Sequence, residues 1–117
     1  MKALIIDDEK DICYLLSKFL EQKHLETSSV NNLYDATLEL KKIHPGIVFL
    51  DNHLPDGLGL NFIKYLKLNY PDIKIVMITA DDITLDKKTV FKEGADYFIG
   101  KPFSRETIFN MVEKLMN

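Results

Sequence analysis

Short apolar runs alternate with amphipathic segments along this 117-residue chain, and that alternation limits the fold more than any other feature. The runs are rich in residues that favour β-strands, and Gly, Pro or polar residues bound them, so they are too short for helices. They cover residues 3–6, 26–30, 46–50, 73–78 and 97–99. The run at 26–30 is the most polar, which suits the edge of a sheet.

The segments between these runs have apolar residues at helical spacing. In the first segment, the expected apolar face consists of Ile12, Leu15, Leu16, Phe19 and Leu20. Similar patterns predict helices over residues 33–43, 60–67, 84–93 and 108–115. Five strands alternating with five helices predict a doubly wound α/β fold, because right-handed crossovers place helices on both faces of a parallel sheet. The expected strand order is the flavodoxin-like order 2-1-3-4-5.

Composition narrows the class of protein further. A chain of 117 residues with 46% apolar residues fits a single domain over residues 1–117. Its 15 basic and 18 acidic residues are scattered, which argues against direct nucleic-acid binding. No apolar stretch is long enough to span a membrane, and the first run leads into three acidic residues, unlike a signal peptide, so a cytoplasmic location is expected. Cys13 is the only cysteine, and its helical segment predicts a buried thiol.

Polar residues follow four of the predicted strands at their carboxyl ends. They are Asp7, Asp8, Asp51, Thr79 and Lys101. Ligands of a doubly wound sheet bind outside these ends, near the reversal of strand order between strands 1 and 3. Carboxylates brought together there repel each other and require a cation, and Mg²⁺ fits oxygen ligands best. The Lys101 ammonium and the Thr79 hydroxyl suit a phosphoryl group, which leaves one carboxylate free as a nucleophile and predicts an aspartyl phosphate.

Short motifs identify a family. In chain order they are IIDDE at residues 5–9, FLD at 49–51, LPDGLGL at 54–60, VMITA at 76–80, GADY at 94–97 and GKPF at 100–103. With these motifs the chain resembles the receiver domain of bacterial two-component response regulators over essentially its whole length. The glycines of the LPDGLGL motif, Gly57 and Gly59, are interpreted as turn residues.

The resemblance implies the role of each site residue. Asp51 accepts a phosphoryl group from the phosphohistidine of a sensor histidine kinase or a phosphotransfer protein, in a reaction that requires Mg²⁺. Asp8 and Asp51 ligate the ion through their carboxylates, His53 does so through its main-chain carbonyl, and Asp7 acts mainly through water. Thr79 donates to the phosphoryl group and Lys101 pairs with it.

The resemblance also implies supporting and switching residues. The small Ala80 leaves the phosphoryl site open, and the Lys101-Pro102 peptide bond is cis. Phosphorylation moves Thr79 and turns Phe98 inward, which alters the surface of the fourth helix, fifth strand and fifth helix around residues 84–105. Tyr97, the neighbour of Phe98, is expected to point to the opposite side of the strand.

Several alternatives remain open. A flavodoxin-like binding module and a phosphohydrolase use related folds, but the acidic residues after the first strand would repel a flavin phosphate, and His53 stands where a hydrolase would carry a second aspartate. A signalling switch is expected to be no enzyme beyond slow autophosphorylation and autodephosphorylation, whose pH dependence the His53 side chain could affect. The chain is either a complete regulator or part of a longer one with a downstream output domain, and either a monomer or a phosphorylation-dependent dimer.

Overall fold

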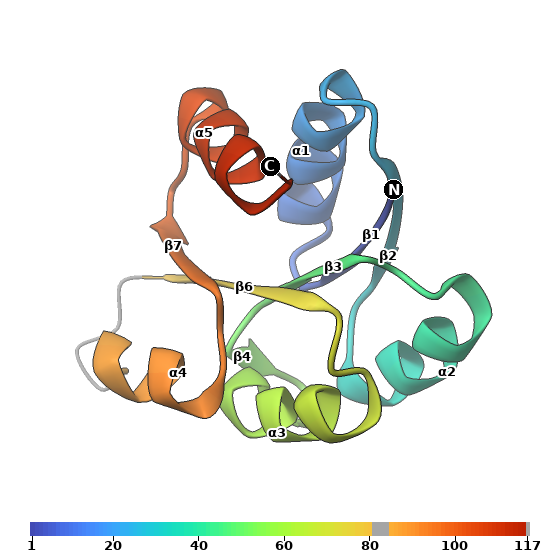
Figure 1. Ribbon diagram of the computed structural model, residues 1–117, viewed down its shortest axis with the longest axis vertical. Coiled ribbons are helices and arrows are strands. Elements are labelled where there is room, and N and C mark those ends of the chain that lie inside the picture. Colours follow the sequence, from blue (N-terminus) through green and yellow to red (C-terminus); the bar gives the residue numbers. More distant parts are fainter. Residues whose placement is uncertain (81–84, 117) are drawn as a thin grey trace.

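The computed structural model describes residues 1–80 and 85–116. Within these residues, five parallel strands form one sheet (Figure 1). They are β1 (Lys2–Ile6), β2 (Glu26–Val30), β3 (Ile47–Leu50), β6 (Lys74–Ala80) and β7 (Tyr97–Lys101). Their spatial order is β2-β1-β3-β6-β7, which is the predicted order 2-1-3-4-5 when these strands are counted along the chain.

Helices cover both faces of the sheet, as the alternating pattern predicts. They are α1 (Lys10–Gln22), α2 (Leu33–Ile43), α3 (Gly59–Asn69), α4 (Lys87–Glu93) and α5 (Arg105–Met116). Figure 1 shows α1 and α5 on one face and α2, α3 and α4 on the other. The fold is therefore doubly wound α/β. None of the helices in the described ranges is long and apolar enough to cross a lipid bilayer.

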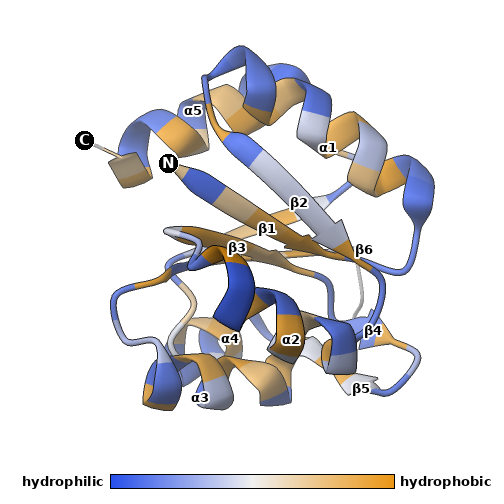
Figure 2. Cartoon of the chain, turned by 90° about the vertical axis from the view of Figure 1, so that its right-hand side faces the viewer, coloured by the Kyte–Doolittle hydropathy of each residue, from blue (hydrophilic) through white to orange (hydrophobic). Residues whose placement is uncertain are grey.

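Two clusters of buried apolar residues lie on the two faces of the sheet. Because successive side chains of a strand point to opposite faces, Leu4 and Ile6 of β1 join the cluster under α2 and α3, whereas Ala3 and Ile5 join the cluster under α1 and α5. All four residues of β3 are buried. Figure 2 shows β1 and β3 as predominantly hydrophobic strands between the two helical layers. The predicted run at 46–50 thus forms the centre of the core.

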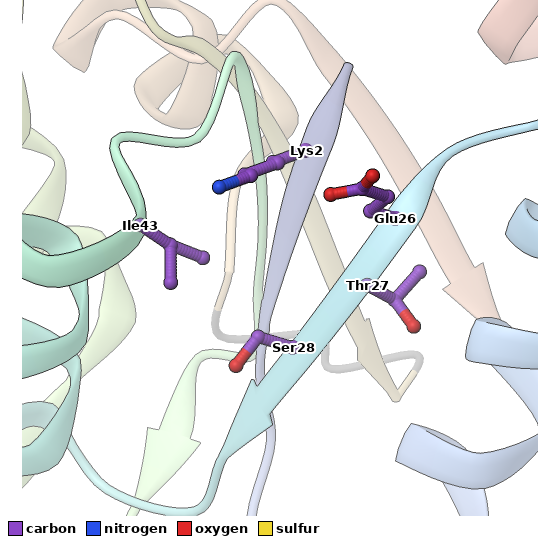
Figure 3. A pocket seen from close by; sticks show the side chains of 5 residues that line it. All are labelled: Lys2, Glu26, Thr27, Ser28 and Ile43. Carbon is purple, nitrogen blue, oxygen red and sulfur yellow. The ribbon is translucent and has the colours of Figure 1, made fainter.

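The polar strand β2 occupies an edge of the sheet, as predicted. Figure 3 shows Thr27 and Ser28 on opposite sides of this strand, with Ser28 on the side of Ile43 from α2. The Ser28 hydroxyl donates a hydrogen bond of 2.7 Å to the Glu39 carboxylate. Polar side chains are tolerated here because an edge strand is only partly covered by helices.

Two details of the predicted helices are wrong. A helix was expected from Thr84, which lies outside the described residues, but α4 begins at Lys87 because Asp86 accepts a hydrogen bond from the Lys88 amide and caps it. Leu15 was expected in the core, yet it is 39% exposed. The buried positions of α1 are Cys13, Leu16 and Leu20, which follow a narrower stripe than the sequence pattern indicated.

A short hairpin between β3 and α3 was not predicted. It consists of β4 (His53–Leu54) and β5 (Gly57–Leu58). At its turn, the Asp56 carboxylate accepts hydrogen bonds from the amides of Leu33 and Tyr34 at 2.8 and 3.0 Å. These amides begin α2, and the Leu33 bond is the main cause that holds the pKa of Asp56 below its usual value. The segment that follows the site is thereby attached to a neighbouring helix.

Candidate functional site

Strand register brings the predicted site residues together at the carboxyl edge of the sheet. Ile6 of β1 pairs with Leu50 of β3, so the residues that follow them, Asp7 and Asp51, lie side by side. The Asp51 amide continues this ladder by donating to the Ile6 carbonyl at 2.9 Å. At the other side of β6, Ala80 pairs with Lys101. The order of the strands therefore gathers residues that are up to 94 positions apart in the sequence.

Carboxylates of Asp7, Asp8 and Asp51 converge at this edge. Each offers an oxygen, and these oxygens lie within 4.8 Å of one another. Asp7 and Asp51 are buried, whereas Asp8 is exposed to solvent. A cluster of oxygen ligands that is buried on one side and open on the other suits a hard cation that keeps part of its water shell, as Mg²⁺ does.

Lys101 lies among these carboxylates. Its Nζ atom is 2.8 Å from Oδ2 of Asp7, 3.2 Å from Oε2 of Glu9 and 3.6 Å from Oδ1 of Asp51. Burial alone lowers the pKa of Lys101, but the hydrogen bond and charge of Asp7 and the charge of Asp51 outweigh it and raise the pKa. The Lys101-Pro102 peptide bond is cis, as the resemblance implied.

The buried carboxylates of Asp51 and Asp7 have raised pKa values, so their charged forms are disfavoured. Burial is the largest cause that raises the pKa of Asp51 and the negative charge of Asp7 is the second, while Lys101 opposes both, and the net result is a pKa of about 6. Burial also raises the pKa of Asp7, and the hydrogen bond from Lys101 opposes that effect. A single lysine thus compensates the cluster incompletely, which is the condition under which a bound divalent cation is favourable.

Thr79 contributes a buried hydroxyl that has no hydrogen-bond partner among the described residues. The residue is 1% exposed, and no group of the described residues hydrogen-bonds to its Oγ1 atom. A buried hydroxyl without a partner is unfavourable in the folded protein, so such groups commonly serve a ligand. Thr79 lies near the end of β6, beside Gly100 and one residue before the position that faces Lys101.

Substitution of Thr79 by valine is expected to raise the free energy of unfolding by about 1 kcal/mol, because valine has the same shape without the unpaired hydroxyl. Urea denaturation without metal measures the change. Thr37→Val is the control, since the Thr37 hydroxyl donates to the Tyr34 carbonyl at 2.6 Å, and this variant should gain nothing. A loss of stability in Thr79→Val would show that its hydroxyl is already satisfied.

The other predicted residues surround this centre. His53 is exposed and pairs with Leu58 in the hairpin, and Ala80 is exposed at the end of β6. Phe98 packs on the same side as α2, α3 and α4, with the Lys87 Nζ atom 5.3 Å from the centre of its ring. Tyr97 packs on the opposite side, against α1 and α5, so the predicted alternation is confirmed.

Three residues beside the site were not recognised from the sequence. The Asn52 amide donates to Oδ1 of Asp51 at 2.9 Å, and its side chain accepts from the Leu60 amide at 3.0 Å. Glu9 contacts Lys101. Gly59 is the first residue of α3 and not a turn residue, and a Cβ atom there would collide with the main-chain oxygen of Asp51. Glu9 and Gly59 lie within two of the short motifs and Asn52 lies between two of them, and these positions were the only available signal.

Comparison with known proteins identifies the family. The response regulator receiver domain model matches residues 3–113. The phosphate regulon transcriptional regulatory protein PhoB of Escherichia coli (strain K12) is 32% identical over 117 residues, which cover 98% of this chain and 51% of PhoB. The response regulator protein PilR of Pseudomonas aeruginosa is 37% identical over 101 residues, which cover 86% of this chain and 23% of PilR. The chain thus spans about half the length of one relative and about a quarter of the other.

Solved structures agree with this result. A two-component response regulator from Clostridium difficile has a TM-score of 0.92 to this chain at 27% identity, with 99% of this chain and 95% of the other covered. Because the family model spans residues 3–113, nearly the whole chain, and PilR is itself a response regulator, this protein belongs to the response regulator receiver domain family.

Proposed function

We propose that Asp51 is the phosphoacceptor of a two-component signalling switch. The observation that carries this proposal is the convergence of the buried Asp51 carboxylate with Asp7, Asp8 and the Lys101 ammonium at one end of the sheet. The family match supports the same role. A flavin-binding or hydrolase function is not favoured, because the matched relatives are response regulators.

In the proposed reaction, an Asp51 carboxylate oxygen attacks the phosphorus atom of a phosphohistidine. The new P–O bond forms as the P–N bond breaks, and the electron pair stays on the imidazole nitrogen. The Asn52 amide holds Oδ1 of Asp51 at 2.9 Å and fixes the direction of the carboxylate. Lys101 and Thr79 are the groups of this chain that would bind the phosphoryl oxygens, the first as a charge and the second as a hydrogen-bond donor.

The residues present fit a Mg²⁺ ion. Asp7, Asp8 and Asp51 would hold it, with the main-chain carbonyl of His53 as a further ligand. The ion would neutralise charge between the carboxylates and the incoming phosphoryl group. The raised pKa values of Asp51 and Asp7 support this assignment, because they reflect charge that the chain alone does not balance.

The proposed output is a change of surface. Phosphorylation adds about −1.5 to −2 charges and strong acceptor oxygens to the site of Thr79, whose hydroxyl has no hydrogen-bond partner among the described residues. Movement of Thr79 would open space for Phe98, which is half-buried between the sheet and α4. Ala80 leaves the phosphoryl position accessible, and Pro102 supports the Lys101 backbone. We propose that the α4, β7 and α5 surface then binds an output protein or domain, in a monomer or a phosphorylation-dependent dimer.

The relatives are signalling proteins and not classical enzymes. We propose that this chain receives its phosphoryl group in the cytoplasm from a sensor histidine kinase or a phosphotransfer protein. Its own chemistry would be limited to slow autophosphorylation and autodephosphorylation.

Incubation with acetyl phosphate and Mg²⁺ tests the proposal directly. Intact-mass spectrometry should show one added phosphoryl group on the wild type and none on Asp51→Asn, because the amide is not a nucleophile. Asp72→Asn, which removes an exposed aspartate at the opposite end of the sheet, should be labelled like the wild type. Equal labelling of Asp51→Asn would place the acceptor elsewhere.

The same preparation tests the switch. Amide NMR signals in α4 and β7 should shift when beryllofluoride is added with Mg²⁺. Shifts limited to the immediate neighbours of Asp51 would contradict a change of the α4, β7 and α5 surface.

A further inference from the structure

Lys101 is bound by a carboxylate that has no part in the proposed reaction. Oε2 of Glu9 lies 3.2 Å from the Lys101 Nζ atom, closer than Oδ1 of Asp51 at 3.6 Å. The Lys101 side chain is 11% exposed, whereas that of Glu9 is 58% exposed. One of the partners of the nearly buried Lys101 ammonium is therefore a solvent-exposed carboxylate, that of Glu9.

Glu9 differs from the other carboxylates around Lys101 in what else it can bind. Among the described residues, the carboxylates that converge as a possible metal site are those of Asp7, Asp8 and Asp51, and Glu9 is not one of them. A cation bound there would draw negative charge from Asp7 and Asp51 and weaken their pairing with Lys101. The pairing with Glu9 would persist.

The backbone fixes Glu9 in this position. Its amide donates to Oδ1 of Asp7 at 2.9 Å, and its carbonyl accepts from the Cys13 amide at 3.1 Å in the first turn of α1. The main chain of Glu9 is therefore held by hydrogen bonds to the Asp7 side chain and to the first turn of α1. A glutamate at this position reaches Lys101 without a loop movement.

We propose that Glu9 is a positioning residue that competes with the phosphoryl group for Lys101. This inference rests on the proposed phosphoacceptor function of Asp51. In the unphosphorylated protein, Asp7 and Glu9 hold the ammonium at 2.8 and 3.2 Å, closer than Asp51 at 3.6 Å. The phosphoryl group must break the Glu9 contact before Lys101 can pair with it, so Glu9 lowers the affinity of the site for phosphoryl-like anions.

The expected effect is modest, because one partner of the ion pair is exposed. Pairs of this kind correspond to about a two- to fivefold change in an equilibrium constant. Glu9→Gln keeps the shape of the side chain and removes its charge. In the presence of saturating Mg²⁺, this variant should bind beryllofluoride about two- to fivefold more tightly than the wild type, as measured by an NMR titration of backbone amides.

A double-mutant cycle separates this mechanism from general charge repulsion. In the Lys101→Met background, Glu9→Gln should have no effect on the affinity, since its partner is absent. Asp11→Asn is the matched control, because Asp11 is an exposed acid that lines the same open pocket as Glu9 but has no described contact with Lys101. This control should leave the affinity unchanged.

A second measurement needs neither metal nor anion. In the metal-free protein, Glu9→Gln should shift the side-chain nitrogen resonance of Lys101, and Asp11→Asn should not. Together with the titration, this result would establish that Glu9 acts through Lys101.

Several outcomes overturn the proposal. If Glu9→Gln tightens beryllofluoride binding equally with and without Lys101→Met, the substitution has only relieved charge repulsion. The same conclusion follows if Asp11→Asn tightens binding. Weaker binding by Glu9→Gln would mean that Glu9 directs Lys101 toward the anion. If the wild type binds no beryllofluoride, both the proposed function and this inference are wrong. If the wild type binds it but the double-mutant cycle shows no coupling between Glu9 and Lys101, only this inference is wrong.

Discussion

Asparagine in place of Asp51 is expected to raise the stability of the metal-free protein at pH 7 by about 1–3 kcal/mol. The buried Asp51 carboxylate has a pKa of about 6 in the folded protein against 3.8 for an ordinary aspartate, mainly because of burial and then because of the Asp7 charge. Ionising it therefore costs the folded state more than the unfolded state. Asparagine removes the charge and retains an oxygen for the Asn52 amide.

The pH dependence of this gain follows from the sign of the shift. Below about pH 4 the carboxyl group is protonated in both states and the penalty is absent. Between pH 4 and 6 the unfolded chain releases its proton first, so the stability of the wild type falls relative to the variant. Above pH 6 the penalty is complete. Urea denaturation from pH 4 to 8 measures the difference, which should be small at pH 4 and full at pH 7.

The control for this series is Asp72→Asn, which changes an exposed aspartate and should show no such rise. A gain for Asp51→Asn that is equal at pH 4 and pH 7 would assign the effect to packing and not to charge. Added Mg²⁺ should narrow the difference, because an ion that binds only the folded wild type stabilises it by mass action.

Much of this site could be predicted from the sequence because parallel strands impose a simple rule. Residues that follow the carboxyl ends of adjacent strands must meet, so Asp7 and Asp51 could be placed together from strand order alone. The alternation of side chains along β7 likewise separated Tyr97 from Phe98. These predictions succeeded because they depend on backbone periodicity and not on the details of packing.

The features that were missed depend on contacts between distant segments. Asp56 appeared only as a member of the LPDGLGL motif, yet it caps α2 from 22 and 23 residues away. No local pattern identifies such a partner, because the hairpin must first dock on the helix. The contact between Glu9 and Lys101 spans 92 residues and depends on side-chain direction. Sequence periodicity places backbones, whereas these pairings arise only after the layers pack.

Alanine in place of Gly59 is expected to destabilise the protein by about 2–3 kcal/mol, although alanine is the better helix former. A Cβ atom at this position would overlap the main-chain oxygen of Asp51 and approach the Leu50 side chain to 3.0 Å. The first obstacle is backbone and cannot rotate away. Asp51 is held on both sides, by the Ile6 carbonyl and through Asn52. The collision must therefore move either the start of α3 or the proposed phosphoacceptor itself.

Displacement of Asp51 should also slow its phosphorylation by acetyl phosphate about tenfold or more, because small misplacements of a nucleophile reduce rates strongly. Gly100→Ala provides the matched control, since no atom lies within 4 Å of the Cβ that it adds, and its stability should be nearly unchanged. Thermal unfolding and intact-mass labelling measure the two effects. If Gly59→Ala has the same thermal stability and the same rate of phosphorylation as Gly100→Ala, the segment before α3 shifts without moving Asp51. The glycine would then not be needed to position the acceptor. If stability and labelling fall together, the contact between the first residue of α3 and the Asp51 carbonyl sets the position of the acceptor.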